Sequence, residues 1–238
     1  MMKLVTTANP AKEVGEAISD SINIHDGDVV CLLSGGSALN VVEYITVIAD
    51  NKRSLSECRT IFMMGDERVS REPKINNSLQ LLSKFSDTIV AKNLLVTIPE
   101  ENETAENFAT RIRKSFAENI SKLNNIKIIM ILGVGADGHT AGIFPLPKES
   151  FRTTYKEDAE YVSVSNKSLK IDSRASFTPD FILNTVDQIF GYIIGESKKN
   201  ILNELNSSKK EIYERPAEVL KLHSNATVYT DIDVDVAN

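Results

Sequence analysis

The chain has 238 residues, of which 42% are hydrophobic and 25% are charged, which suits a single globular domain over residues 1–238. Its formal net charge of −6, without any basic stripe, argues against nucleic acid or an anionic membrane as a partner. No apolar run approaches the roughly 20 residues of a membrane span, and two cysteines without metal or redox spacing are typical of free thiols, so we expect a cytoplasmic protein.

The first predicted elements are a helix and a buried strand. Asn9 and Pro10 are typical of a helix start, because Asn caps free backbone N–H groups and Pro fits the first helical position. The apolar run at 28–33 then predicts a strand buried on both faces. A Ser-Gly-Gly-Ser turn at 34–37 follows, and we expect a helix over 38–49. Strand, glycine-rich turn and helix in this order form a βα unit.

The same alternation continues through the middle of the chain. Residues 60–64 predict a second apolar strand, which ends at the sequence Gly-Asp-Glu-Arg of residues 65–68. A short helix is expected to begin at residues 76–77. Apolar residues recur at helical spacing over 104–123, which predicts the clearest helix of the chain. The apolar run at 126–132 follows as the central strand.

A polar segment without a predicted element, at 146–158, separates these elements from the last part of the chain. The elements predicted beyond it are a strand at 161–164, a loop at 165–173, a strand at 174–177, a helix starting at 178–179, a strand at 188–194, helices at 196–206 and 216–222, and a strand at 227–231. Strands that alternate with helices imply an α/β fold: a Rossmann-like, doubly wound and mostly parallel sheet with helices on both faces.

Polar turns follow three of the apolar strands, at residues 34–37, 65–68 and 133–140. In open α/β sheets, ligands bind outside the carboxyl ends of the strands, where such turns meet. Packing alone explains one polar turn more easily than three. We therefore expect a single functional site at this edge of the sheet.

The turn of Ser34, Gly35, Gly36 and Ser37 is a candidate anion site. Backbone N–H groups of a glycine-rich turn at the start of a helix point outward and attract phosphate. The alternative is a tight structural turn in which Ser37 is the N-cap of the following helix. The motif by itself does not decide between these two interpretations.

His139 is the strongest catalytic candidate, because it lies among turn glycines directly after the central strand. Its imidazole would serve as a general base if the carboxylate of Asp137 or Asp66 holds it in place. Asp137 could instead fix the turn through its own backbone hydrogen bonds. The other two histidines, His25 and His223, are interpreted as structural or merely exposed.

Three cations, Arg68, Arg174 and Lys198, lie near predicted strand ends. By default each is a solvated surface charge. Together they could supply the local positive field that an acidic protein needs for an anionic substrate. No cluster of His, Cys and Asp has the spacing of metal ligands, so we expect neither a metal nor another cofactor.

Taken together, these residues resemble the 6-phosphogluconolactonase family. Residues 133–145 match that family's signature Gly-x-Gly-x-Asp-Gly-His-Thr-Ala-x-x-Phe-Pro, and the Ser-Gly-Gly-Ser and Gly-Asp-Glu-Arg turns match two further motifs. The resemblance continues in order through residues 174–185, 195–202 and 215–220. It therefore covers nearly the whole chain.

The chain departs from the family pattern in three loops. Ala38 and Leu39 stand where Thr-Pro is usual, the segment between Arg68 and Asn77 is about one residue short, and Leu146 replaces a Gly. The related glucosamine-6-phosphate deaminases share the Gly-x-Asp-Gly-His core. They usually carry Asp-Glu-Tyr in place of Asp-Glu-Arg and lack the Thr-Ala-x-x-Phe-Pro that follows the histidine, and both differences favour the lactonase.

The resemblance implies hydrolysis of 6-phospho-D-glucono-1,5-lactone to 6-phospho-D-gluconate in the oxidative branch of the pentose phosphate pathway. It implies that His139 activates the attacking water and that Asp66 or Asp137 holds its imidazole. The turn at 34–37 would bind the phosphate together with Arg68 and one of the other two cations. Two alternatives stay open: deamination and isomerisation of an amino-sugar phosphate, and a sugar-phosphate-binding regulator without catalysis.

Overall fold

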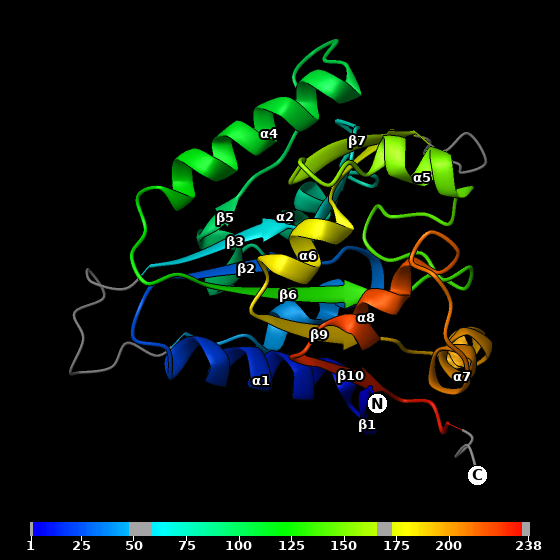
Figure 1. Cartoon of the computed structure of the whole chain (residues 1–238). Coiled ribbons are helices and arrows are strands. Elements are labelled where there is room, and N and C mark those ends of the chain that lie inside the picture. Colours follow the sequence, from blue (N-terminus) through cyan, green and yellow to red (C-terminus); the bar gives the residue numbers. More distant parts are fainter. Residues whose placement is uncertain (1, 48–58, 166–172, 235–238) are drawn as a thin grey trace.

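The computed structural model describes residues 2–47, 59–165 and 173–234. Its centre is a seven-stranded sheet of order β1-β10-β9-β6-β2-β3-β5, in which each neighbouring pair is parallel (Figure 1). The strands span Lys3–Thr6 (β1), Val29–Leu33 (β2), Thr60–Met64 (β3), Leu94–Leu95 (β5), Lys127–Gly133 (β6), Gln188–Tyr192 (β9) and Ala226–Thr230 (β10). The expected α/β fold with a mostly parallel sheet is confirmed.

Helices cover both faces of this sheet (Figure 1). The α-helices are Pro10–Asn23 (α1), Asn77–Phe85 (α2), Ile89–Lys92 (α3), Ala105–Ile120 (α4), Lys148–Thr154 (α5), Pro179–Asn184 (α6), Lys199–Ser207 (α7) and Val219–Leu222 (α8). The 3-10 helices are Gly36–Tyr44 (η1), Glu196–Lys198 (η2) and Pro216–Glu218 (η3). One core joins α1 and η1 to the sheet, and the other joins α4, α6 and α8 to its opposite face.

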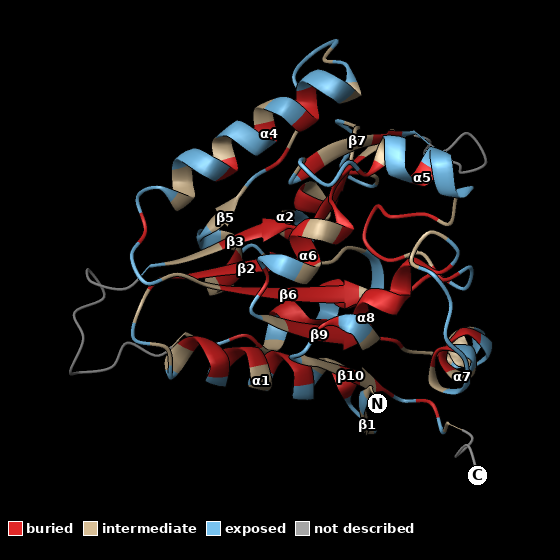
Figure 2. Ribbon diagram, in the orientation of Figure 1, coloured by how far each residue is buried: buried red, intermediate tan, exposed pale blue. Residues whose placement is uncertain are grey.

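Strand β6 lies in the middle of the sheet, and its successive residues face opposite cores. Ile129 and Ile131 belong to the core under α1, whereas Ile128, Met130 and Leu132 belong to the core under α4 and α6. Most of β6 is buried (Figure 2). Each fully buried side chain of this size contributes about 1.5–3 kcal/mol to the free energy of unfolding. The strand is thus fixed from both sides, and so is the starting point of the loop that carries His139.

A second, smaller sheet lies beside the carboxyl end of the first. It is antiparallel, with the order β4-β8-β7, and consists of Asp66–Arg68 (β4), Ser173–Phe177 (β8) and Tyr161–Ser165 (β7). The chain passes from β3 to β4 through Gly65, whose N–H donates to the carbonyl of Leu33 at 2.7 Å. The sequence pattern did not separate these strands from the parallel sheet.

Four predicted helix starts are confirmed by their caps. The side chains of Asn9, Asn76, Thr104 and Thr178 each accept a hydrogen bond from the backbone N–H three residues later, at 2.9–3.3 Å. Each bond satisfies one of the N–H groups that a helix start leaves free. These starts were predictable because the cap and the group it satisfies are neighbours in the sequence.

Other boundaries differ from the predictions. The helix expected over 38–49 is the 3-10 helix η1, which starts at Gly36 and ends at Tyr44; residues 48–49 of that prediction lie outside the described residues. The polar segment at 146–158 contains α5, and the strand expected over 188–194 ends at Tyr192. The expected loop at 165–173 falls largely on residues 166–172, which lie outside the described residues.

Within the described ranges, the structure contains no helix of the length and apolarity needed to cross a membrane.

Candidate active site

A cavity of about 190 Å³ opens at the carboxyl ends of β2, β6 and β9, beside β4 and β8. It brings together nine of the residues predicted from sequence: Ser34, Gly35, Gly36, Ser37, Asp66, Arg68, His139, Arg174 and Lys198. The tenth, Asp137, contacts His139 and does not itself line the cavity. Segments that are far apart in the chain therefore form one site.

The imidazole of His139 is held by Asp137. Its Nδ1 lies 2.5 Å from Oδ1 of Asp137, which also accepts the backbone N–H of His139 at 3.2 Å. The hydrogen bond from His139 lowers the pKa of Asp137 to about 2, so this carboxylate is ionised at neutral pH. Because an ionised carboxylate can only accept, Nδ1 carries the proton, and Nε2 is the nitrogen that can take one from a ligand.

The turn that carries this pair needs its glycines. The N–H of Gly135 donates to the carbonyl of His139 at 2.8 Å, and that of Gly138 donates back to the carbonyl of Gly135 at 3.0 Å. Gly138 has φ of +84°, a conformation that strongly favours glycine. At Gly135 an added Cβ would lie 2.0 Å from Nδ1 of His139. Any side chain at that position would displace the imidazole.

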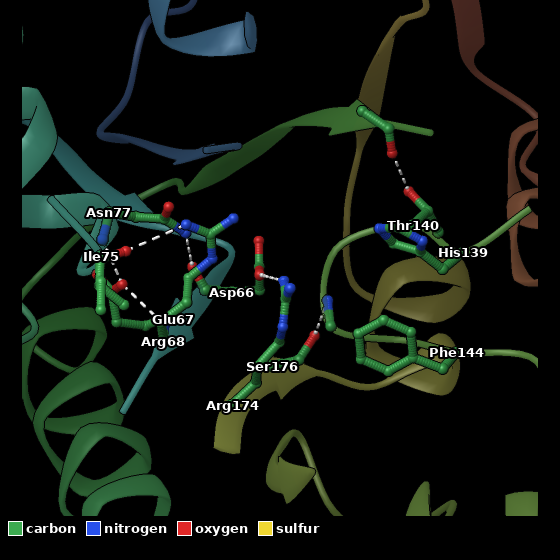
Figure 3. Close-up of polar contacts among 12 residues, drawn as sticks. Asp66, Glu67, Arg68, Ile75, Asn77, His139, Thr140, Phe144, Arg174 and Ser176 are labelled. Atoms are coloured by element: carbon green, nitrogen blue, oxygen red, sulfur yellow. Dashed lines mark hydrogen bonds and ion pairs between the residues drawn. The ribbon is translucent and has the colours of Figure 1, made fainter. Parts of the chain in front are cut away.

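Asp66 contacts Arg174 and not His139. Oδ2 of Asp66 lies 3.5 Å from Nη1 of Arg174, and both side chains are largely buried (Figure 3). The antiparallel register of β4 and β8 pairs Arg174 with Arg68, so two guanidinium groups reach the same cavity. Burial lowers the pKa of Arg174. The negative charge of Asp66 opposes this lowering, and the positive charge of Arg68 adds to it.

The two arginines that line the cavity are only partly hydrogen-bonded. Nη1 of Arg68 donates to the carbonyl of Ile75 at 3.1 Å (Figure 3). The Nε atoms of Arg68 and Arg174 are buried and have no hydrogen-bond partner among the described residues. Two guanidinium groups that line one cavity form a site suited to a multiply charged oxyanion such as a phosphate.

Glu67 lies between Asp66 and Arg68 in β4 but points away from the cavity, as alternation along a strand requires. Its carboxylate accepts the backbone N–H groups of Asn77 and Ser78 at 2.5 and 2.9 Å, and so ties β4 to the start of α2. Burial raises the pKa of Glu67 to about 7, against the lowering effect of these bonds. Its role in the Gly-Asp-Glu-Arg motif is therefore to hold the strand.

The Ser-Gly-Gly-Ser turn requires both glycines for different reasons. An added Cβ on Gly35 would lie 2.2 Å from Oδ1 of the buried Asn77, whereas Gly36 has open space but φ of +66°. The N-cap of η1 is Gly35, with no side-chain hydrogen bond, and Ser37 lies inside the helix. The structural interpretation of Ser37 as an N-cap is wrong, and Ser37 lines the cavity.

Seven further residues line the cavity and were not singled out from the sequence as site residues: Ala38, Gly133, Val134, Gly135, Ala141, Tyr192 and Ile194. Most of them follow β6 or β9, so their position at strand ends was the signal that could have found them. Ala141 has φ of +48°, an uncommon conformation for a residue with a Cβ.

A buried ion pair lies next to the turn that carries His139. Arg215 is 1% exposed, and its Nε donates to Oε1 of Glu218 at 2.6 Å. The N–H of Ala217 donates to the carbonyl of Gly138 at 2.9 Å, and a Cβ on Gly138 would lie 2.8 Å from Cγ of Arg215. The turn that carries His139 is therefore packed directly on this pair.

Among the described residues, no group of three or more His, Cys, Asp and Glu side chains is arranged to hold a metal ion.

The model of the glucosamine-6-phosphate isomerase/6-phosphogluconolactonase family matches residues 4–229. The chain belongs to this family. The match spans all three motifs of the cavity and every strand of the central sheet except the start of β1 and the end of β10. The resemblance drawn from the motifs is thereby confirmed.

Two curated relatives of this chain are named for the lactonase activity, one of the two activities in the family's description. A 6-phosphogluconolactonase of Borreliella burgdorferi is 31% identical over 201 residues, which cover 82% of this chain and 81% of the relative. A probable 6-phosphogluconolactonase of Dictyostelium discoideum is 25% identical over 228 residues, or 92% and 90% of the two chains. The crystal structure of 6-phosphogluconolactonase from Thermotoga maritima superposes with a TM-score of 0.69 at 20% identity, over 95% of this chain and 96% of the other. That superposition shows a shared fold.

Proposed function

We infer that this family member hydrolyses 6-phospho-D-glucono-1,5-lactone to 6-phospho-D-gluconate, in the oxidative branch of the pentose phosphate pathway. One observation carries the inference: the same cavity joins His139, paired with Asp137, to the guanidinium groups of Arg68 and Arg174. The names of the relatives support the same reaction. We further propose a cytoplasmic location, because cysteines without metal or redox spacing are typical of a reducing compartment.

The phosphate of the substrate would bind at the arginine side of the cavity. Arg68 and Arg174 bring two positive charges, and Lys198 adds a third cation to the cavity wall. The turn at 34–37 would add backbone N–H groups at the start of η1. A local cluster of this kind overrides the formal net charge of −6 of the whole chain.

The chemistry would be general acid–base catalysis by His139. Nε2 would take a proton from water as the water oxygen attacks the lactone carbonyl, and Asp137 would stabilise the imidazolium that forms. The same proton would then pass to the ring oxygen as its bond to the carbonyl carbon breaks. A lactone is an activated ester, so these steps require no covalent nucleophile. Backbone N–H groups of the glycine turns would stabilise the developing oxyanion.

Asp66 would act on the substrate through Arg174. Its distance of 3.5 Å from Nη1 of Arg174, and the absence of a contact to His139 among the described residues, support an orienting role at the anion subsite. Of the two carboxylates considered for holding the imidazole, the geometry favours Asp137.

The direct test is turnover of freshly prepared 6-phosphogluconolactone at neutral pH, corrected for its spontaneous opening. Proton release that is proportional to enzyme concentration is the expected result. Release of ammonia from glucosamine 6-phosphate without lactone hydrolysis would instead identify a deaminase. Tight binding of 6-phosphogluconate without turnover of either substrate would identify a regulator.

A further inference from the structure

A buried tyrosine outside every motif of the site is bound to the loop that follows His139. Tyr155 directly follows helix α5 as its C-cap residue and is 4% exposed. Its hydroxyl accepts the backbone N–H of Phe144 at 2.9 Å and donates to the carbonyl of Gly142 at 2.9 Å. One hydroxyl therefore satisfies two buried backbone groups, two residues apart, on the same loop.

The loop held in this way carries an aromatic ring that contacts both halves of the site. The Phe144 ring lies 5.0 Å from the His139 ring between centroids, with the planes inclined by 39°. The guanidinium carbon of Arg174 lies 5.2 Å from the centroid of the same ring (Figure 3). Phe144 is 1% exposed and does not line the cavity, so its ring contacts the imidazole and the guanidinium on the protein side and not on the cavity side.

The loop does not hold its shape through local preference alone. Ala141 has φ of +48°, a left-handed conformation that costs a residue with a Cβ about 1–2 kcal/mol. A second anchor comes from β8, where Oγ of Ser176 accepts the N–H of Gly142 at 3.0 Å. Such a conformation persists where the surroundings impose it. Here Tyr155 and Ser176 impose it from two sides.

We propose that Tyr155 is a positioning residue for the hydrolysis. Its hydroxyl fixes the segment from Gly142 to Phe144, and the Phe144 ring in turn fixes the imidazole of His139 and the guanidinium of Arg174 relative to each other. The proposal rests on the proposed function for its kinetic consequence, but the geometric coupling does not depend on it.

The test compares two buried tyrosines, one whose hydroxyl is hydrogen-bonded to the loop and one whose hydroxyl has no hydrogen-bond partner among the described residues. In Tyr155→Phe the ring stays and both loop contacts are lost, so kcat/KM for the lactone should fall about 10-fold, or about 1.4 kcal/mol of transition-state stabilisation. Tyr161 is the matched control, because its buried hydroxyl has no hydrogen-bond partner among the described residues. Tyr161→Phe should stay within about twofold of the wild type. Equal values for the wild type and Tyr155→Phe would overturn the proposal.

A spectroscopic readout separates this proposal from the proposed function. The chain has three histidines, so the ring-proton signals of His139 can be assigned by their loss in His139→Gln. Because the Phe144 ring shields or deshields these protons, the signals should move in Tyr155→Phe and in Phe144→Leu, and should stay in place in Tyr161→Phe. A wild type that fails to hydrolyse the lactone would remove the proposed function and leave this measurement intact. Unmoved His139 signals in Tyr155→Phe would refute the positioning role.

A double-mutant cycle tests whether Tyr155 acts through Phe144. If Tyr155 acts through Phe144, the variant with both Tyr155→Phe and Phe144→Leu should lose no more kcat/KM than Phe144→Leu alone. Additive losses would show that Tyr155 acts by another route and would contradict the proposal. If Tyr155→Phe does not fold, Phe144→Leu still decides the matter, because wild-type kinetics in that variant would exclude a role for the ring.

Discussion

Nδ1 of His139 lies 2.5 Å from Oδ1 of Asp137, two residues earlier in the same glycine-rich turn. The turn itself is closed by hydrogen bonds between Gly135, Gly138 and His139, and it rests on the buried pair of Arg215 and Glu218. The orientation of the imidazole is therefore set by contacts within the protein and does not await a ligand. This arrangement leaves Nε2 as the proton acceptor of the site.

Asp137→Asn should slow the reaction without preventing binding. The amide is neutral, so it stabilises the imidazolium less, and kcat should fall about 10- to 100-fold, part of the effect of general acid–base catalysis. KM should change little, because Asp137 does not line the cavity. Steady-state kinetics measure both values. Asp20→Asn, at an exposed position on α1, is the control, and an equal effect of the two variants would contradict the assigned role.

Arg68→Met should weaken binding of the phosphate. The side chain keeps its apolar length and loses its charge, so KM for 6-phosphogluconolactone should rise by about 10-fold or more. Hydrolysis of unphosphorylated gluconolactone should be unaffected. Arg71→Met removes an exposed arginine that donates to the carbonyl of Pro99 and serves as the control. A similar rise in KM for both lactones would argue against a phosphate contact.

Glu67 should make the free energy of unfolding depend on pH. Burial raises the pKa of Glu67 from 4.5 to about 7 in the folded protein. Between these two values the folded state binds a proton that the unfolded state has lost, so stability falls as pH rises through this window. Urea unfolding at pH 5 and pH 7.5 should show this loss in the wild type and a smaller one in Glu67→Gln. Parallel pH dependence in the two proteins would refute the assignment.

The two glycines of the Ser-Gly-Gly-Ser turn should differ in their response to alanine. A Cβ on Gly35 meets Oδ1 of Asn77, a fully buried side chain whose Nδ2 donates to the carbonyl of Asp66, so Gly35→Ala should cost about 1–3 kcal/mol and raise KM. Gly36→Ala meets nothing and should cost about 1 kcal/mol from its positive φ. Urea unfolding and kinetics of both variants test the contrast. A milder effect at Gly35 would contradict the packing of this turn against Asn77.

The features that could be predicted from the sequence are those set by neighbouring residues. The caps at Asn9 and Thr104 satisfy N–H groups three residues away, and the apolar run of β6 is long enough to identify a buried strand. Polar turns after such strands then pointed to a common edge. The candidate site was accessible to sequence reasoning for this reason.

The features that the sequence did not reveal depend on distant pairing. Arg174 contacts Asp66 across 108 positions, and the sequence around either residue does not predict the antiparallel sheet that joins them. Glu67 and Arg68 are adjacent charges in the sequence, yet the pleat of β4 sends one to the cavity and the other to α2. Helix α5, with Pro147 as its N-cap residue, lies in a polar segment without a clear helical pattern, so Tyr155 could not be placed in advance.

The most direct test of the account is turnover by His139→Gln, measured with 6-phosphogluconolactone and corrected for spontaneous opening, beside calorimetric binding of 6-phosphogluconate. Loss of the general base should lower kcat by roughly 10²- to 10⁴-fold. The dissociation constant of 6-phosphogluconate should stay within a few-fold of the wild-type value, because the arginines that would hold its phosphate are unchanged. A variant that turns over the lactone at the wild-type rate would contradict the account.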